Sequence, residues 1–131
     1  MIADLLIDVL TQADIDGRIE ALYVFGSTAA GRTRDDSDVD LAFLAEREAD
    51  PVTVFDAAQT LAGHLGREVD LIDLRRASTV MRLQVLANGR RIFAGDIVAA
   101  DTFEMYAFSD YARLQEERAE TIRSFEAAYD D

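Results

Sequence analysis

Apolar residues recur along the first part of the chain in two alternating periods. From residue 2 to 13 they follow the three-and-four spacing of an amphipathic helix. Two apolar runs rich in β-branched and aromatic residues, over 19–25 and 39–45, predict buried strands. Between these runs the sequence predicts a short helix over 27–32 and a polar turn over 33–37.

The second part of the chain repeats this alternation. The only proline suits the first turn of a helix, and an apolar stripe at helical spacing continues from there. In order, we expect a helix over 51–65, a strand over 68–74, a helix over 79–87, a short edge strand over 91–94 and a long helix over 99–129.

Strands that alternate with helices predict α/β layering, in an α/β or α+β fold. The economical arrangement is a small mixed sheet of three to four strands, with helices packed on one side and a long C-terminal helix. The sequence contains no linker-like or repeated segment. We therefore expect one domain over 1–131, with a core over about 15–95 and a C-terminal helical segment over about 99–130 that either closes the core or docks a partner.

Composition excludes several kinds of site. The chain has no cysteine and one histidine, so neither a disulfide framework nor a multi-histidine zinc site is possible within it. No apolar run approaches the roughly 20 residues of a membrane span. The first residues are not those of a signal peptide, because no basic residue precedes Arg18. We expect a cytoplasmic protein that does not contact a membrane.

The net charge of −13 comes from 26 acidic residues against 13 basic ones, all of them arginine. Proteins that bind nucleic acid directly usually carry a basic excess, so that class is disfavoured. The charge suits a small nucleotide together with a basic or mixed-charge protein partner.

The first chemical motif is Gly26-Ser27, directly after the strand over 19–25. Glycine lets the backbone approach an anion closely. Ser27 then begins a short helix, where its hydroxyl and the free N–H groups could hold phosphate oxygens. On its own, Gly-Ser at this position is more typical of a plain turn than of a phosphate site.

The second motif is Asp38-Val-Asp40, at the start of the next strand. Residues two apart on a strand point to one face, so Asp38 and Asp40 form a pair of carboxylates that repel each other unless a cation neutralises them. Oxygen ligands of this kind suit Mg²⁺ or Mn²⁺. Two such ions, about 3.5–4 Å apart, can assist nucleotidyl transfer. The alternative for the tripeptide alone is a solvated strand end.

A two-metal site generally requires a third carboxylate. Asp70 and Asp73 lie three apart on the strand over 68–74, so they face opposite sides. Asp70, between Val69 and Leu71, is expected to be a buried carboxylate that needs a partner or a metal, and we assign it to the site. Asp73 is expected to cap, to pair with a neighbouring arginine or to meet water. In this hypothesis Asp38, Asp40 and Asp70 are the catalytic and metal-binding residues.

Four arginines lie near these motifs: Arg32, Arg34, Arg75 and Arg76. Guanidinium groups match phosphate geometry, but pairing with nearby carboxylates is the more usual outcome for arginines placed like these four. The sequence leaves their roles open.

The spacing Gly26-Ser27, ten residues, Asp38-x-Asp40 and a later strand aspartate resembles the signature of the DNA polymerase β-like nucleotidyltransferase superfamily. The short length and the residues around Asp38 and Asp70 look most like its minimal nucleotidyltransferase (MNT) branch. The likeness covers roughly residues 15–95.

What the resemblance implies is specific. It implies a polymerase β-like fold and the antitoxin of a type VII-like toxin–antitoxin pair, whose partner is a HEPN-domain RNase toxin. With ATP as substrate and Mg²⁺ as cofactor, two ions being expected, the protein would transfer AMP to a hydroxyl of the toxin, with tyrosine as the expected acceptor, and so inactivate it. It also implies phosphate binding by Gly26 and Ser27, and metal binding by the three aspartates.

Two other functions remain open at this point. The chain could be an antitoxin that neutralises by binding alone, or a nucleotidyltransferase for a small, aminoglycoside-like molecule.

Overall fold

The computed structural model describes residues 2–13, 15, 17–30 and 38–129 of the 131-residue chain. Along the chain the elements are α1 (Ile2–Gln12), β1 (Ile19–Val24), α2 (Gly26–Ala29), β2 (Val39–Ala45), α3 (Pro51–Leu65), β3 (Val69–Asp73), α4 (Thr79–Asn88), β4 (Arg90–Ala94) and α5 (Ile97–Tyr129). The expected elements are therefore present in the expected order. The turn predicted over 33–37 and the end of the helix predicted over 27–32 fall outside the described residues.

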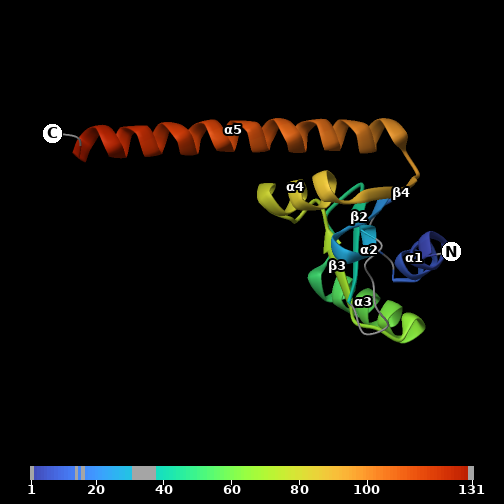
Figure 1. Cartoon of the computed structure of the whole chain (residues 1–131). Helices are drawn as coiled ribbons and strands as arrows, with labels where there is room; N and C mark the ends of the chain where they lie inside the picture. Colours follow the sequence, from blue (N-terminus) through green and yellow to red (C-terminus); the bar gives the residue numbers. More distant parts are fainter. Residues whose placement is uncertain (1, 14, 16, 31–37, 130–131) are drawn as a thin grey trace.

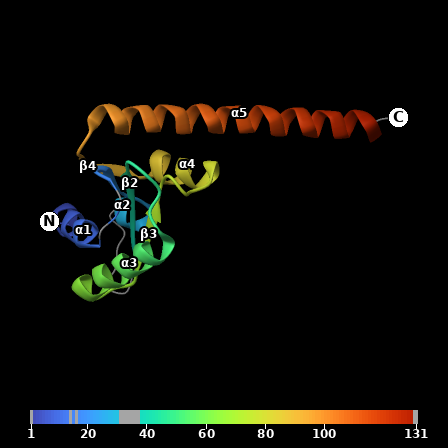
Figure 2. The ribbon, with the colours of Figure 1, turned by 180° about the vertical axis from the view of Figure 1, so that it is seen from behind.

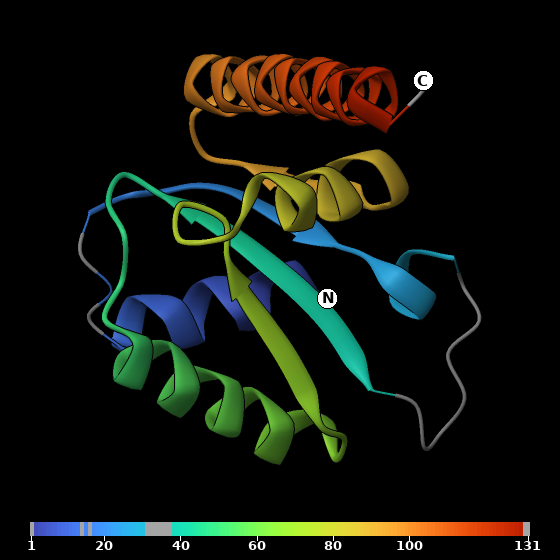
Figure 3. The same cartoon turned by 90° about the vertical axis from the view of Figure 1, so that its left-hand side faces the viewer.

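The four strands form one mixed sheet in the order β3-β2-β1-β4. Strand β1 is antiparallel to both of its neighbours, whereas β2 and β3 are parallel. Parallel neighbours need a crossover connection, which α3 supplies. Strand β3 is therefore an outer strand, and its first residues lie beside the first residues of β2 (Figure 3).

Helices cover both faces of this sheet, so the expectation of helices on one side is wrong. On one face, side chains such as Leu22 and Phe43 pack under α1 and α3. On the other face, Tyr23 and Leu44 pack under α4 and the start of α5 (Figure 3). The physical reason is that successive residues of β1 and β2 are apolar, and a strand without polar alternation must be buried on both sides.

The helix boundaries follow capping signals in the sequence. The Asp50 side chain accepts a hydrogen bond from Val52 N at 3.0 Å, and Pro51 occupies the first turn of α3. Gly66 ends α3 in the left-handed conformation. The Ser78 hydroxyl accepts from Met81 N at 3.1 Å and begins α4.

Helix α5 has 33 residues and two unlike halves. Its first half closes the core through Ala100, Phe103 and Ala107. From Gln115 to Tyr129 every side chain except Ala119 is exposed, and this half projects past the body (Figures 1 and 2). Among the described residues, no helix combines the length and the apolar character needed to cross a membrane.

Deleting residues 116–131 should change the free energy of unfolding by less than about 1 kcal/mol, because exposed helical residues contribute little packing. Phe103→Ala should cost about 2 kcal/mol, because Phe103 packs on the core and lies under the guanidinium groups of Arg75 and Arg82. Urea unfolding of both variants checks this. A truncation that costs more than Phe103→Ala would show that the projecting half supports the fold.

Candidate active site

The turn after β1 is built around a contact between Gly26 and the side chain of Asp40. Gly26 has φ +58°, and a Cβ built on it would overlap Asp40 Oδ2 and lie 3.1 Å from Asp40 Cγ. Both the left-handed backbone and the missing side chain are therefore required here. The sequence motif predicted a glycine that approaches a phosphate; the group that lies against Gly26 in the structure is the carboxylate of the second motif.

Backbone hydrogen bonds hold this turn to β2. Phe25 N donates to Asp40 O at 3.1 Å, which extends the β1–β2 pairing up to the turn. Asp40 N donates to the hydroxyl of Thr28 at 2.9 Å. Thr28 was missed by the sequence analysis. The signal for it was its place in the first turn of a short helix, where hydroxyls satisfy nearby backbone donors.

Ser27 lies half-buried in the first turn of α2. The first backbone bonds of this helix are donated by Ala29 and Ala30, to Phe25 O and Gly26 O. The N–H groups of residues 26–28 precede those bonds, and N–H groups at such positions are the ones that bind anions. The predicted phosphate residues are thus placed next to the predicted metal residues.

The register of the sheet brings the carboxylates together. Asp38 is exposed just before β2, Asp40 is half-buried in it, and Asp70 is the direct partner of Asp40 on the parallel strand β3. Burial raises the pKa of Asp40, and the charges of Asp70 and then Asp38 raise it further. These three carboxylates therefore act on one another, as expected for neighbouring like charges.

The burial expected of the β3 aspartates is wrong. Asp70 is exposed, and the buried one is Asp73, with 6% of its surface exposed. Asp73 accepts hydrogen bonds from Ala49 N at 2.8 Å and Arg75 N at 3.1 Å, so it is a capping residue, one of the roles expected for it. Leu71 and Asp73 of the same strand are buried, so exposure here belongs to Asp70 and not to the whole strand. What brings Asp70 to the site is its register with Asp40.

The three carboxylates suit a hard divalent cation chemically. Across the part of the chain that the structure describes, no group of three or more Asp, Glu, His or Cys side chains is already arranged to hold a metal ion. Holding one here would require the carboxylates to turn toward a common point. Mg²⁺ would remove the repulsion that raises the pKa of Asp40, and carboxylate oxygens are its usual ligands.

Arg75 and Arg76 have structural partners. Arg75 donates through Nη2 to Glu20 Oε1 at 2.6 Å and through Nε to the carbonyl of Ala45. Arg76 Nε donates to Ala49 O at 2.9 Å. Both arginines follow the C-terminal end of β3, whereas Asp70 lies near its start. Arg32 and Arg34 lie outside the described residues.

Comparison with known proteins finds a matching family model, a related enzyme and similar solved structures. The family model described as polymerase beta, nucleotidyltransferase, matches residues 6–97. The protein adenylyltransferase MntA of Shewanella oneidensis is 37% identical over 105 residues, which is 80% of this chain and 75% of the relative.

Two solved complexes contain chains of similar structure. One is a toxin–antitoxin with AMP-PNP, with a TM-score of 0.80 and 34% identity over 92% of this chain and 95% of that chain. The other is the tri-AMPylated Shewanella oneidensis HEPN toxin in complex with MNT antitoxin, with a TM-score of 0.74 and 33% identity over 92% of each chain.

Replacing Gly26 should destabilise the contact between the two motifs and so lower the free energy of unfolding. Gly26→Ala should cost about 2 kcal/mol of stability, since alanine is strained at positive φ and its Cβ would collide with Asp40. The matched control is Gly63→Ala within α3, where nothing in the described part of the chain lies within 4 Å of an added Cβ; it should gain up to about 1 kcal/mol. Equal effects of the two substitutions on urea unfolding would contradict this.

Asp40→Asn should raise the thermal unfolding temperature in metal-free buffer at neutral pH. The pKa of Asp40 is raised in the fold, so its ionised form destabilises the protein at every pH above that raised pKa. The advantage of the variant should shrink as the pH falls through this pKa, because the wild-type carboxyl then takes up a proton. Added Mg²⁺ should stabilise the wild type more than the variant. An Asn variant that is less stable in EDTA would contradict the assignment.

Proposed function

Since the chain belongs to the polymerase beta nucleotidyltransferase family, we propose that it is the adenylyltransferase antitoxin of a toxin–antitoxin pair, transferring AMP from ATP to a hydroxyl of a HEPN-domain toxin. The observation that carries this proposal is the contact of Gly26 with Asp40, because it joins an anion-binding turn to a group of three carboxylates. Phosphate and divalent-cation binding side by side is what chemistry on a nucleoside triphosphate needs.

The relatives support the nature of both substrates. A similar chain occurs in a toxin–antitoxin structure with AMP-PNP, which is an analogue of ATP. Another occurs beside a HEPN toxin that carries three AMP groups. MntA, the adenylyltransferase, shares more than a third of the aligned residues with this chain. We take ATP as the nucleotide and a tyrosine hydroxyl of the toxin as the acceptor.

Phosphate binding, metal binding and positioning fall to different residues of the site. The N–H groups of the first turn of α2 and the hydroxyl of Ser27 bind the outer phosphates of ATP. Asp38, Asp40 and Asp70 would hold Mg²⁺, in two ions if the site fills completely. The bound metal would supply charge neutralisation of the triphosphate. Thr28 is a positioning residue, because its hydroxyl fixes the backbone of Asp40.

The transfer itself is a displacement at phosphorus. The acceptor hydroxyl oxygen forms a bond to the α-phosphorus, and the bond from that phosphorus to the bridging oxygen breaks, which releases pyrophosphate. Asp70 accepts the proton of the hydroxyl. Its exposure, which overturned the burial argument, suits this role because an acceptor from another molecule must reach it.

Neutralisation by binding alone is the second candidate, and one observation favours it. The projecting half of α5 exposes Ile122, Phe125 and Tyr129, a stripe with helical spacing that could bury itself in a complex. The two candidates predict different results for a variant that lacks the carboxylates but still forms the complex. If catalysis is needed, that variant no longer protects cells, whereas if binding suffices, it still does.

Combined Asp38→Asn and Asp40→Asn should lower AMP transfer to the toxin by roughly a hundredfold or more, because both remove charge that holds the metal. Asp56→Asn, on the exposed side of α3, is the control and should transfer AMP normally. Intact-mass measurement of the toxin after incubation with ATP and Mg²⁺ reports the product, and gel filtration reports the complex. Full protection of cells by the double variant would instead establish neutralisation by binding.

A further inference from the structure

The outer edge of β3 offers backbone groups to a further strand. Val39 N bonds to Glu68 O, and Leu74 N bonds to Phe43 O, so the even-numbered residues of this segment turn their backbone groups toward β2. Backbone groups alternate in direction along a strand, hence those of Val69 and Leu71 point away from the sheet. Edge groups of this kind are a template for pairing with another chain.

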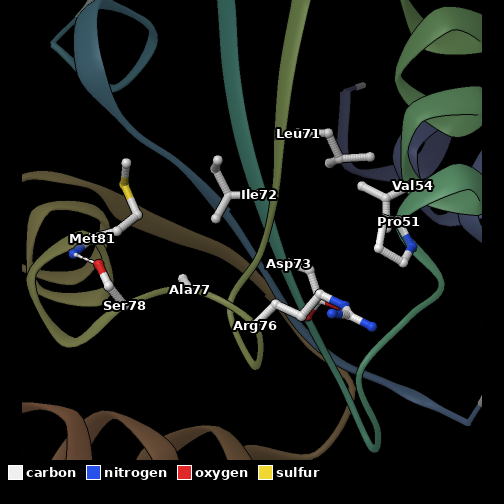
Figure 4. A pocket seen from close by; sticks show the side chains of 9 residues that line it. All are labelled: Pro51, Val54, Leu71, Ile72, Asp73, Arg76, Ala77, Ser78 and Met81. Carbon is white, nitrogen blue, oxygen red and sulfur yellow. Dashed lines mark hydrogen bonds between the residues drawn. The ribbon is translucent and has the colours of Figure 1, made fainter.

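A groove of about 300 Å³ runs along this edge. Pro51 and Val54 of α3 form one wall, and Met81 of α4 belongs to the other (Figure 4). Figure 4 shows Leu71 pointing toward Val54 and Ile72 pointing toward the α4 side. A strand added here would find apolar surface for side chains on both of its faces.

The candidate active site lies next to the groove along the same strand, because Leu71 lines the groove and Asp70 is the residue before it. Asp70 also shares a sheet face with Ile72, because residues two apart on a strand point the same way. A residue paired opposite Asp70 would have its Cβ about 5 Å from that of Asp70 and on the same face. The other outer strand, β4, has no such relation, because β1 and β2 separate it from β3.

Resting on the proposed function, we infer that β3 binds the acceptor protein as an extended segment that adds a strand to the sheet. The segment pairs with the backbone of Val69 and Leu71. Its hydroxyl-bearing residue lies opposite Asp70, and the next two residues are apolar and occupy the groove beside Leu71 and Ile72. This is recognition by strand addition, in which backbone bonds supply affinity and alternate side chains supply specificity.

Charge selects the occupant. The groove is lined mainly by apolar side chains, with Asp73 and Arg76 as its charged residues. Asp70, the residue before Leu71, belongs to a group of three carboxylates, and the chain carries a net charge of −13. A basic segment of another protein is attracted to this surface, while a second copy of this acidic chain is repelled from it. A dimer of the chain that pairs two β3 edges is the alternative occupant, and the experiment below distinguishes it from the toxin.

Hydrogen exchange on the unmodified chain, without ATP, tests the pairing directly. On mixing with the HEPN toxin, exchange of the Leu71 amide should slow by roughly tenfold or more, while the Ile72 amide, which faces β2, should change little. A complex that leaves Leu71 exchange unchanged would overturn the inference. So would a toxin-free dimer in which the Leu71 amide is already protected.

Substitutions in the groove test its part in acceptor recognition. Val54→Arg and Met81→Arg should each raise the KM for the toxin about tenfold, which is about 1.4 kcal/mol, and leave the KM for ATP nearly unchanged. The matched controls, Val52→Arg on α3 and Gln84→Arg on α4, are exposed positions outside the groove and should leave both constants near their wild-type values.

The inference and the proposed function fail in different ways. If the wild type AMPylates the toxin and the groove variants match their controls, strand addition is wrong and the transferase assignment stands. If the wild type transfers no AMP, the transferase assignment is wrong, and exchange at Leu71 in the complex still decides whether β3 binds the partner.

Discussion

The close approach of Gly26 to the carboxylate of Asp40 is the constraint on which the site depends. It requires a residue without a side chain at positive φ, and it brings the end of β1 against the start of β2. The bond from Phe25 N to Asp40 O carries the strand pairing up to this contact. The Gly26-Ser27 turn and the carboxylates are thus fixed to each other by strand register, although eleven positions separate Ser27 from Val39 in the sequence.

Strand β3 carries one buried aspartate and one exposed aspartate at its two ends. Asp73, at its C-terminal end, is buried and satisfied by two backbone donors, and next to it Arg75 binds Glu20. Asp70, near the other end, is exposed and raises the pKa of Asp40. One end of the strand therefore stabilises the fold while the other carries like charges that a cation would neutralise. Such a division, in which a group of like charges lowers stability at one place, is common at functional sites.

Local pattern predicted most of this architecture, and tertiary contacts account for the rest. Apolar spacing and caps predicted every described element, and the two-residue spacing of Asp38 and Asp40 placed them together. Burial of Asp70 was predicted from its apolar neighbours, but which residues of a strand are covered depends on tertiary packing, which no local pattern contains. Arg75 and Arg76 bind the carbonyls of Ala45 and Ala49, 30 and 27 positions away, and Arg75 also binds Glu20, 55 positions away, so spacing arguments could not find these partners.

The coupling between Gly26 and Asp40 tests the account most directly. In a double-mutant cycle on the free energy of unfolding, Asp40→Ala removes the oxygen that an added Cβ at Gly26 would meet. Gly26→Ala should therefore cost less in the Asp40→Ala background than in the wild type, with a coupling energy of about 1 kcal/mol or more. Additive costs would contradict the contact, and with it the claim that the phosphate turn and the carboxylates form one site.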